Sequence, residues 1–175
     1  MTDSLPVIYL SGLLIILGGL GVFVFSQIIK ARRLENTFGK LQKKLQKSKG
    51  TAKEYYQLGS IYLDKKLYSQ SMTLFQKALK ADTDVEPENK ALIYNAMGYA
   101  CFAQEQLDLA IRHYKDALKL YPDYVIALNN LANVYEKKQM VNKAVELYDQ
   151  SLAIEPTNKV ALRRAKALKK RLVTT

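Results

Sequence analysis

The sequence predicts an all-α protein in which a single N-terminal transmembrane helix precedes a solenoid of three helical hairpins and a C-terminal capping helix. Three observations predict this fold class. Residues 6–29 are uncharged and mostly apolar, similar residues recur at a regular interval through residues 52–158, and a basic amphipathic segment occupies residues 159–172. A period of about 34 residues is typical of a helix–turn–helix unit that stacks on copies of itself.

Residues 1–29 are predicted to be an uncleaved membrane anchor. As a helix rising about 1.5 Å per residue, residues 6–29 would be about 36 Å long, enough to cross a hydrocarbon core of about 30 Å. A secretory signal peptide would have a basic leader and a cleavage site of small residues. The leader here is Met-Thr-Asp-Ser, and no Ala-x-Ala follows the apolar run.

Basic residues flank only one end of this anchor. Lys30, Arg32 and Arg33 follow the apolar run directly, and no Lys or Arg precedes it. Basic residues next to a membrane span are retained on the cytoplasmic side. The sequence therefore places everything after residue 30 in the cytoplasm or in an equivalent compartment such as a plastid stroma.

Residues 30–50 are predicted to form a basic amphipathic linker helix, because Leu34, Phe38, Leu41 and Leu45 recur at helical spacing. Two interpretations stay open. The cations can lie on anionic lipid headgroups, where each lysine contributes about 1 kcal/mol, or the apolar stripe can pack on the first folded unit. The membrane-surface candidates are Lys30, Arg32, Arg33, Lys40, Lys43, Lys44 and Lys47.

Residues 51–175 are predicted to form the repeat domain, with repeats at 52–85, 91–124 and 125–158. The paired positions of the last two copies, each pair separated by one full period, are Gly98 and Ala132, Ala110 and Ala144, Tyr114 and Tyr148, and Pro122 and Pro156. The first copy supplies Tyr55, Leu58, Gly59, Tyr62, Ser71, Phe75 and Ala78 at the same offsets. This period and this pattern of residues resemble the tetratricopeptide repeat (TPR).

The residue types explain how each hairpin packs. Small residues let the two helices approach, large aromatic residues fill the space between layers, and the prolines end the second helices. The first copy departs from the pattern, since Thr83 stands where proline is expected and Gly59 and Gly98 are separated by more than one period. The extra segment "DVEPENK", residues 84–90, predicts a longer exposed loop between the first two repeats.

A stack of hairpins requires a polar-faced cap, and residues 159–172 are predicted to provide it. Leu162, Ala165, Leu168 and Leu172 are expected to face inward, and the cations, Arg164 included, outward. These cations either form only the polar outer face that a cap requires, or also bind an anionic partner or the membrane.

The TPR resemblance implies that the first helix of each hairpin lines a concave surface. Its mixture of apolar and amide side chains suits an extended peptide or a helix face, although some of these residues can face a neighbouring helix instead. Only Asn130 and Arg164 match the TPR clamp for acidic chaperone C-termini, so no such clamp is expected. The candidate partner-binding residues are Tyr56, Ser60, Leu63, Leu92, Asn95, Tyr99, Phe102, Ile126, Asn129, Asn133 and Arg163.

The composition argues against several other classes of function. The net charge of +11 divides into +6 for residues 1–50, −2 for residues 51–158 and +7 for residues 159–175, so the repeats are nearly neutral and no nucleic-acid partner is predicted. Cys101 and His113 are the only cysteine and histidine. We expect Cys101 to be a buried, inert thiol and His113 an outward, solvated side chain. The sequence therefore predicts no enzyme, no catalytic residue, no metal and no cofactor.

One anchor, three TPRs and a basic cap together resemble the small photosystem I assembly TPR proteins of cyanobacteria and plastids. The resemblance implies a single-pass thylakoid protein whose TPR domain, on the stromal or cytoplasmic side, holds photosystem I subunits during assembly. Two alternatives are a membrane-anchored TPR receptor in protein import or secretion, and a lipid-responsive structural protein driven by its basic ends. The sequence does not predict the oligomeric state.

Overall fold

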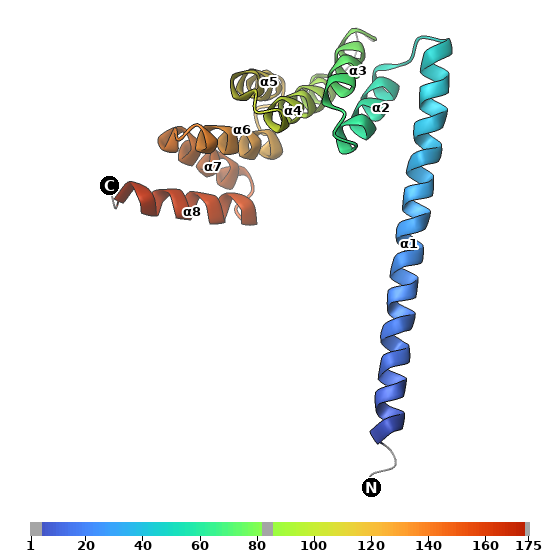
Figure 1. The fold of residues 1–175 in the computed structure, drawn as a ribbon. Helices are drawn as coiled ribbons and strands as arrows, with labels where there is room; N and C mark the ends of the chain where they lie inside the picture. The colour runs from blue at the N-terminus through green and yellow to red at the C-terminus, as the bar shows by residue number, and fades with distance from the viewer. Residues whose placement is uncertain (1–4, 82–85, 174–175) are drawn as a thin grey trace. The chain divides into compact units, whose positions relative to one another are not determined.

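The computed structural model describes residues 5–81 and 86–173. These residues form eight α-helices and no strand (Figure 1), so the predicted all-α class is confirmed. The chain divides into two compact units, Met1–Lys44 and Leu45–Thr175. The first consists of most of one long helix, and the second holds the helical hairpins.

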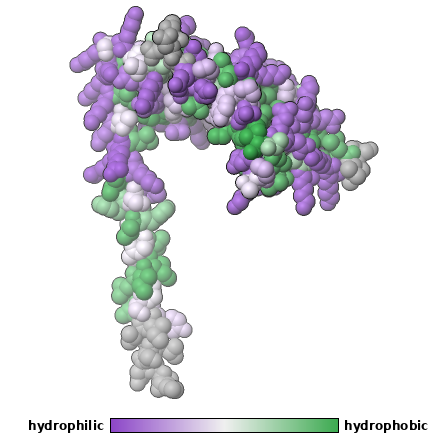
Figure 2. Space-filling model, turned by 180° about the vertical axis from the view of Figure 1, so that it is seen from behind, coloured by the Kyte–Doolittle hydropathy of each residue, from purple (hydrophilic) through white to green (hydrophobic). Residues whose placement is uncertain are grey.

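Helix α1 (Leu5–Lys47) is one unbroken helix of 43 residues. All its large apolar side chains between Tyr9 and Ile29 are exposed, and Figure 2 shows them giving way to hydrophilic side chains farther along the helix. By length and composition this helix could cross a membrane, with a mean hydropathy of 2.3 over its most apolar window. No break separates Ile29 from Lys30, because the residues that follow the apolar run are good helix formers.

Seven shorter helices form the second unit. In chain order they are α2 (Ala52–Asp64), α3 (Tyr68–Ala81), α4 (Pro87–Ala103), α5 (Leu107–Leu120), α6 (Val125–Lys137), α7 (Val141–Ile154) and α8 (Lys159–Val173). A capping box starts α2, in which the Thr51 side chain accepts a hydrogen bond from the Glu54 backbone N–H and the Glu54 carboxylate accepts one from that of Thr51.

Each of the three hairpins turns in the same way. One residue in each turn, Lys66, Glu105 or Gln139, has a positive φ near 60°. The backbone N–H of the next residue bonds back to the last turn of the preceding helix, as in Leu67 N to Tyr62 O at 2.8 Å. The N–H of the positive-φ residue bonds back as well, as in Lys66 N to Leu63 O at 2.9 Å. These two hydrogen bonds form the Schellman motif, and their recurrence shows that the three hairpins share one local geometry.

The hairpins α2–α3, α4–α5 and α6–α7 stack in sequence, with α8 packed on α7 (Figure 1). The small residues predicted to allow close approach are all buried, and a Cβ on Gly59 or Gly98 would lie 2.7 Å from the ring of Phe75 or Tyr114, respectively. The Ser71 hydroxyl donates to the Gly59 carbonyl at 2.8 Å. Small and large residues therefore pack as the repeat pattern predicts.

The connection between the first two repeats differs from its prediction. Residues 87–90 form the first turn of α4 rather than the end of a loop, and the remainder of the predicted loop before Glu86 lies outside the described residues. Proline fits the first helical position because its fixed φ suits a helix and its missing N–H is not needed there. Glu88 also favours a helix start through the helix dipole.

Helix α8 caps the stack with a face that only partly matches the predicted one. The inward prediction is correct for Ala165 and Leu168, but Leu162 and Leu172 are exposed and Ala161 is buried instead. The prediction that Arg164 faces outward is also wrong, because its Nη1 donates to Glu136 Oε1 on α6 at 3.2 Å. The buried positions follow the narrow stripe that contacts the preceding hairpin.

Candidate partner-binding surface

A row of exposed apolar residues recurs at the repeat period in α4, α6 and α8. Leu92, Ile126 and Val160 form this row, and each is exposed. The residue after each of them, Ile93, Ala127 or Ala161, is buried. The row therefore lies on a fixed face of each helix, beside residues that hold the stack together. Farther along α4, Tyr99 is 49% exposed.

Asn95 joins α4 to α6 rather than standing free. The Asn130 amide donates to Asn95 Oδ1 at 2.9 Å, and the Asn95 amide donates to Tyr124 Oη at 3.4 Å. Tyr124 also stacks on Tyr121, with ring centroids 5.6 Å apart. Burial raises the pKa of Tyr124 to about 12, and the neighbouring Tyr56 adds to the effect. This network fixes the junction between the second and third repeats.

Glu136 makes a second internal link. Its carboxylate accepts hydrogen bonds from Arg164 of α8 at 3.2 Å and from the Tyr148 hydroxyl of α7 at 3.5 Å. Burial raises the pKa of Tyr148 to about 12, and the Glu136 carboxylate raises it further. Asn130 and Arg164, the two matches to the carboxylate clamp, both bond within the stack.

Other candidate residues are turned partly inward. Tyr56 and Leu63 pack on the core cluster around Phe75, and the Ser60 hydroxyl donates to the Tyr56 carbonyl at 2.9 Å. Phe102 packs on the larger core cluster, and the Lys137 ammonium lies 5.4 Å from its ring centroid.

The remaining candidate residues are either half-buried or exposed. Asn133 is half-buried, Asn129 is half-buried with its Oδ1 buried and unbonded in the structure, and Arg163 is exposed. The structure thus exposes Leu92, Tyr99, Ile126 and Arg163 among the predicted residues. The sequence analysis missed Tyr121 and Tyr124, which could have been found as an aromatic pair at the junction of two repeats.

His113 is not the solvated side chain that the sequence predicted. It is half-buried, and its ring stacks on Tyr94 with centroids 6.3 Å apart. Burial lowers the pKa of His113, although the Asp116 carboxylate opposes the effect. The prediction that Cys101 is buried is confirmed, and burial raises the pKa of its thiol, which keeps it in the less reactive protonated form.

Sequence and structure comparisons agree on the class of protein. Residues 52–85 and 125–158 match the tetratricopeptide repeat, and residues 98–139 match a further TPR repeat family. The fold resembles MamA, with a TM-score of 0.70 and 22% identity over 81% of this chain and 80% of MamA. It also resembles the first TPR of Spaghetti (RPAP3), solved with an HSP90 peptide, with a TM-score of 0.64 and 20% identity over 72% of this chain and 96% of that one. The chain is a TPR scaffold for protein–protein interaction.

Closer relatives identify the family. The chain is 42% identical to Ycf37 of Cyanophora paradoxa, over 81% of this chain and 82% of the relative. It is 35% identical to Ycf37 of Guillardia theta, over 99% and 97%. It is 36% identical to the chloroplastic TPR-domain protein PYG7 of Arabidopsis thaliana, covering 94% of this chain but only 56% of PYG7. The chain belongs to the Ycf37 family of TPR proteins.

Proposed function

We propose that this protein is a membrane-tethered TPR scaffold that binds protein partners during the assembly or stabilisation of a membrane complex, and that the complex is photosystem I. One observation carries the proposal: apolar side chains stay exposed in two separate places, around α1 and along the row Leu92, Ile126 and Val160. The first exposure suits lipid and the second suits a protein. A chloroplastic relative and the resemblance to photosystem I assembly proteins support the choice of complex.

In this proposal residues 1–29 anchor the protein in the thylakoid membrane, and the TPR domain lies on the stromal or cytoplasmic side. Lys30, Arg32 and Arg33 favour that orientation. The domain boundaries follow the sequence: an anchor at 1–29, a linker at 30–50 and the TPR domain at 51–175.

The continuity of α1 supports a linker that stands as a stalk rather than lying flat on the membrane. Residues 30–47 extend about 27 Å beyond Ile29, whereas the headgroup layer is about 5–8 Å thick. Lys30, Arg32 and Arg33 therefore reach headgroups, while Lys40 stands about 16 Å farther along the helix than Ile29. Lys43, Lys44 and Lys47 lie beyond Lys40. A Cβ on Gly50 would clash with the Leu45 side chain, so the end of the apolar stripe contacts the segment that leads into α2.

Tethering gives the scaffold its advantage in this mechanism. A groove confined to the membrane surface meets membrane-embedded partners at a high effective concentration without any additional contact. Tyr99 and Ile126 are the exposed side chains best suited to anchor a partner segment, because large apolar residues dominate the binding energy of such interfaces.

Two changes test the proposal. Deleting residues 1–29 should move the protein to the soluble fraction and abolish complementation of a null strain. In the full-length protein, Tyr99→Ala with Ile126→Ala should reduce recovery of photosystem I subunits at least tenfold in pull-downs from solubilised membranes. Leu109→Ala is the matched control, because Leu109 is 47% exposed but lies on α5, outside the row. Full complementation by the soluble form, or equal recovery with the Tyr99→Ala, Ile126→Ala variant, would refute the proposal.

The same pull-down separates the alternative of an import or secretion receptor. The apolar row would also accept the apolar face of a targeting helix. Recovery of precursor proteins or translocon components, in place of photosystem subunits, would establish that alternative.

A further inference from the structure

Helix α8 exposes the face that α6 buries against α7. Leu128 of α6 and Leu162 of α8 occupy equivalent positions one repeat apart, but Leu128 is 3% exposed and Leu162 is 48% exposed. Ala132 and Tyr135 of α6 pack in one core cluster with Ala144 and Tyr148 of α7, whereas their equivalents in α8, Lys166 and Lys169, are exposed. In the part of the chain that the structure describes, no helix covers this face of α8.

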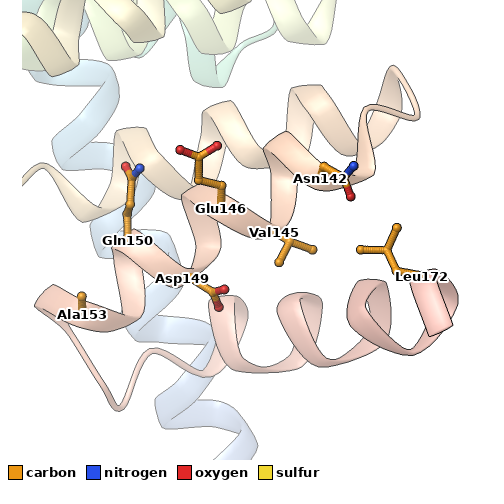
Figure 3. A pocket seen from close by; sticks show the side chains of 7 residues that line it. All are labelled: Asn142, Val145, Glu146, Asp149, Gln150, Ala153 and Leu172. Carbon is orange, nitrogen blue, oxygen red and sulfur yellow. The ribbon is translucent and has the colours of Figure 1, made fainter.

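A hollow of about 550 Å³ opens between α7 and α8 beside this face. Figure 3 shows Val145 of α7 and Leu172 of α8 pointing toward each other across it. Lys169 connects the hollow to the uncovered face, since its ammonium donates to Asp149 at 2.7 Å. The residues that line the hollow are Asn142, Val145, Glu146, Asp149, Gln150, Ala153 and Leu172. We call these residues, together with Leu162, Lys166 and Lys169, the α7–α8 surface.

The charge around the α7–α8 surface selects its partner. Residues 159–172 contain seven Lys or Arg and no Asp or Glu, whereas the α7 side of the surface carries two carboxylates, Glu146 and Asp149. Arg164 and Lys169 pair with carboxylates of this chain, whereas Lys159, Arg163 and Lys166 have no ion-pair partner among residues 5–81 and 86–173. A second copy docked symmetrically here would bring two such cationic helices together, which costs free energy. An acidic partner would instead gain free energy of binding from these cations.

We propose that the α7–α8 surface docks an acidic amphipathic helix of a protein partner. The apolar side of that helix packs on Leu162, Val145 and Leu172, and its flanking carboxylates face Lys159 and Lys166. The partner helix takes the place that the second helix of a fourth hairpin would occupy, as α7 does against α6. This is recognition of a helix face in a groove. It is separate from the apolar row and does not depend on the identity of the partner proposed there.

The test uses the full-length protein in nanodiscs of zwitterionic lipid, with the photo-crosslinker p-benzoylphenylalanine in place of Leu162. The probe is a synthetic helical peptide with leucines at three- and four-residue spacing and flanking glutamates, and the control peptide has lysines in place of the glutamates. A crosslinker at Leu109 controls for peptide that only partitions into lipid. We expect saturable crosslinking of the acidic peptide at position 162 alone, and none of the basic peptide.

Charge reversal sharpens the test. Lys159→Glu with Lys166→Glu should weaken binding of the acidic peptide at least tenfold, and Lys115→Glu, an exposed change on α5, should not. Tyr99→Ala should leave this binding unchanged. Three results would overturn the proposal: no saturable crosslink, a crosslinked dimer of this chain, or binding to anionic vesicles that competes with the peptide. Thermal melting checks that each variant is folded.

Discussion

Helix α1 and the hairpins α2–α7 are both rich in apolar residues, but they use them differently. From Tyr9 to Ile29 the large apolar side chains point to all sides of α1 and none is buried. In the hairpins the buried positions alternate between small and large, with Gly98 against Tyr114 and Gly59 against Phe75. The anchor therefore offers only apolar surface, whereas the hairpins depend on matched shapes.

This difference predicts two kinds of sensitivity. A lipid environment conforms to whatever apolar side chain it meets, so α1 should tolerate changes of size but not of charge. A closely packed interior should tolerate neither, because a displaced neighbour has no free volume to occupy. The predictions below test this contrast, in decreasing order of expected effect.

Charge in the anchor should have the largest effect. Leu13→Arg with Leu17→Arg places two cations near the middle of residues 6–29, at a cost of about 3 kcal/mol each for membrane insertion. The protein should then leave carbonate-washed membranes, which immunoblotting of the pellet and supernatant would measure. Leu13→Phe with Leu17→Phe is the size-matched control and should stay in the pellet. If the arginine variant stays as well, the apolar segment is not what holds the protein to membranes.

Gly98→Val should destabilise the TPR domain, whereas Gly19→Val should not. A Cβ on Gly98 would lie 2.7 Å from the Tyr114 ring, which is itself buried and has no space to move, whereas nothing lies within 4 Å of such an atom on Gly19. Overpacking of this kind costs about 1–3 kcal/mol. Thermal unfolding of the full-length protein followed by circular dichroism compares the two variants. Equal melting temperatures would contradict the close packing of α4 on α5.

The repeat pattern explains why much of the fold could be predicted. The repeat period fixes which residues pair across a hairpin, so the burial of Gly98, Ala132 and Ala144 followed from spacing alone. The apolar pattern of the capping helix, by contrast, gave a wrong prediction for Leu162. Its equivalent, Leu128, is buried, but burial depends on whether another helix covers that face, and a periodic sequence does not contain that information.

The candidate surface was predictable to a smaller extent. Exposure of Leu92 and Ile126 followed from their positions in the repeat. Asn95 was placed on the correct helix, but its bonds to Asn130 and Tyr124 join residues 35 and 29 positions apart. Whether these side chains reach one another depends on the angle at which the repeats stack. No local sequence pattern gives that angle.

Replacing each of two buried serines with alanine should have different effects on stability. Ser71 and Ser151 are both fully buried, but only Ser71 has a hydrogen-bond partner, the Gly59 carbonyl. Ser71→Ala should therefore cost about 1 kcal/mol. Ser151→Ala should be neutral or stabilising, because it removes an unpaired hydroxyl at a position where the two other repeats have Ala78 and Ala117. Denaturant unfolding measures both, and a stabilising Ser71→Ala would contradict the role of its bond.

Tyr148→Phe should have the smallest effect at neutral pH and a distinct one in alkali. The variant loses only the long 3.5 Å hydrogen bond between the Tyr148 hydroxyl and Glu136, so stability at pH 7 should change little. The pKa of Tyr148 is about 12 in the folded protein, above the usual value near 10. Between about pH 10 and 12 this tyrosine is ionised in the unfolded chain but still protonated in the folded protein, so the unfolded state holds fewer protons. Tyr148 therefore makes stability fall as the pH rises from about 10 to 12.

The phenylalanine variant should therefore lose less stability over that alkaline range than the wild type. Urea unfolding at pH 7, 10 and 11.5 would measure the difference between the two proteins. Tyr99→Phe is the matched control, since Tyr99 is half-exposed and its hydroxyl is not held inside the stack. Parallel losses in the wild type and in Tyr148→Phe would mean that the ionised side chain stays in contact with water, and that α7 and α8 pack less closely around it than the buried ring of Tyr148 indicates.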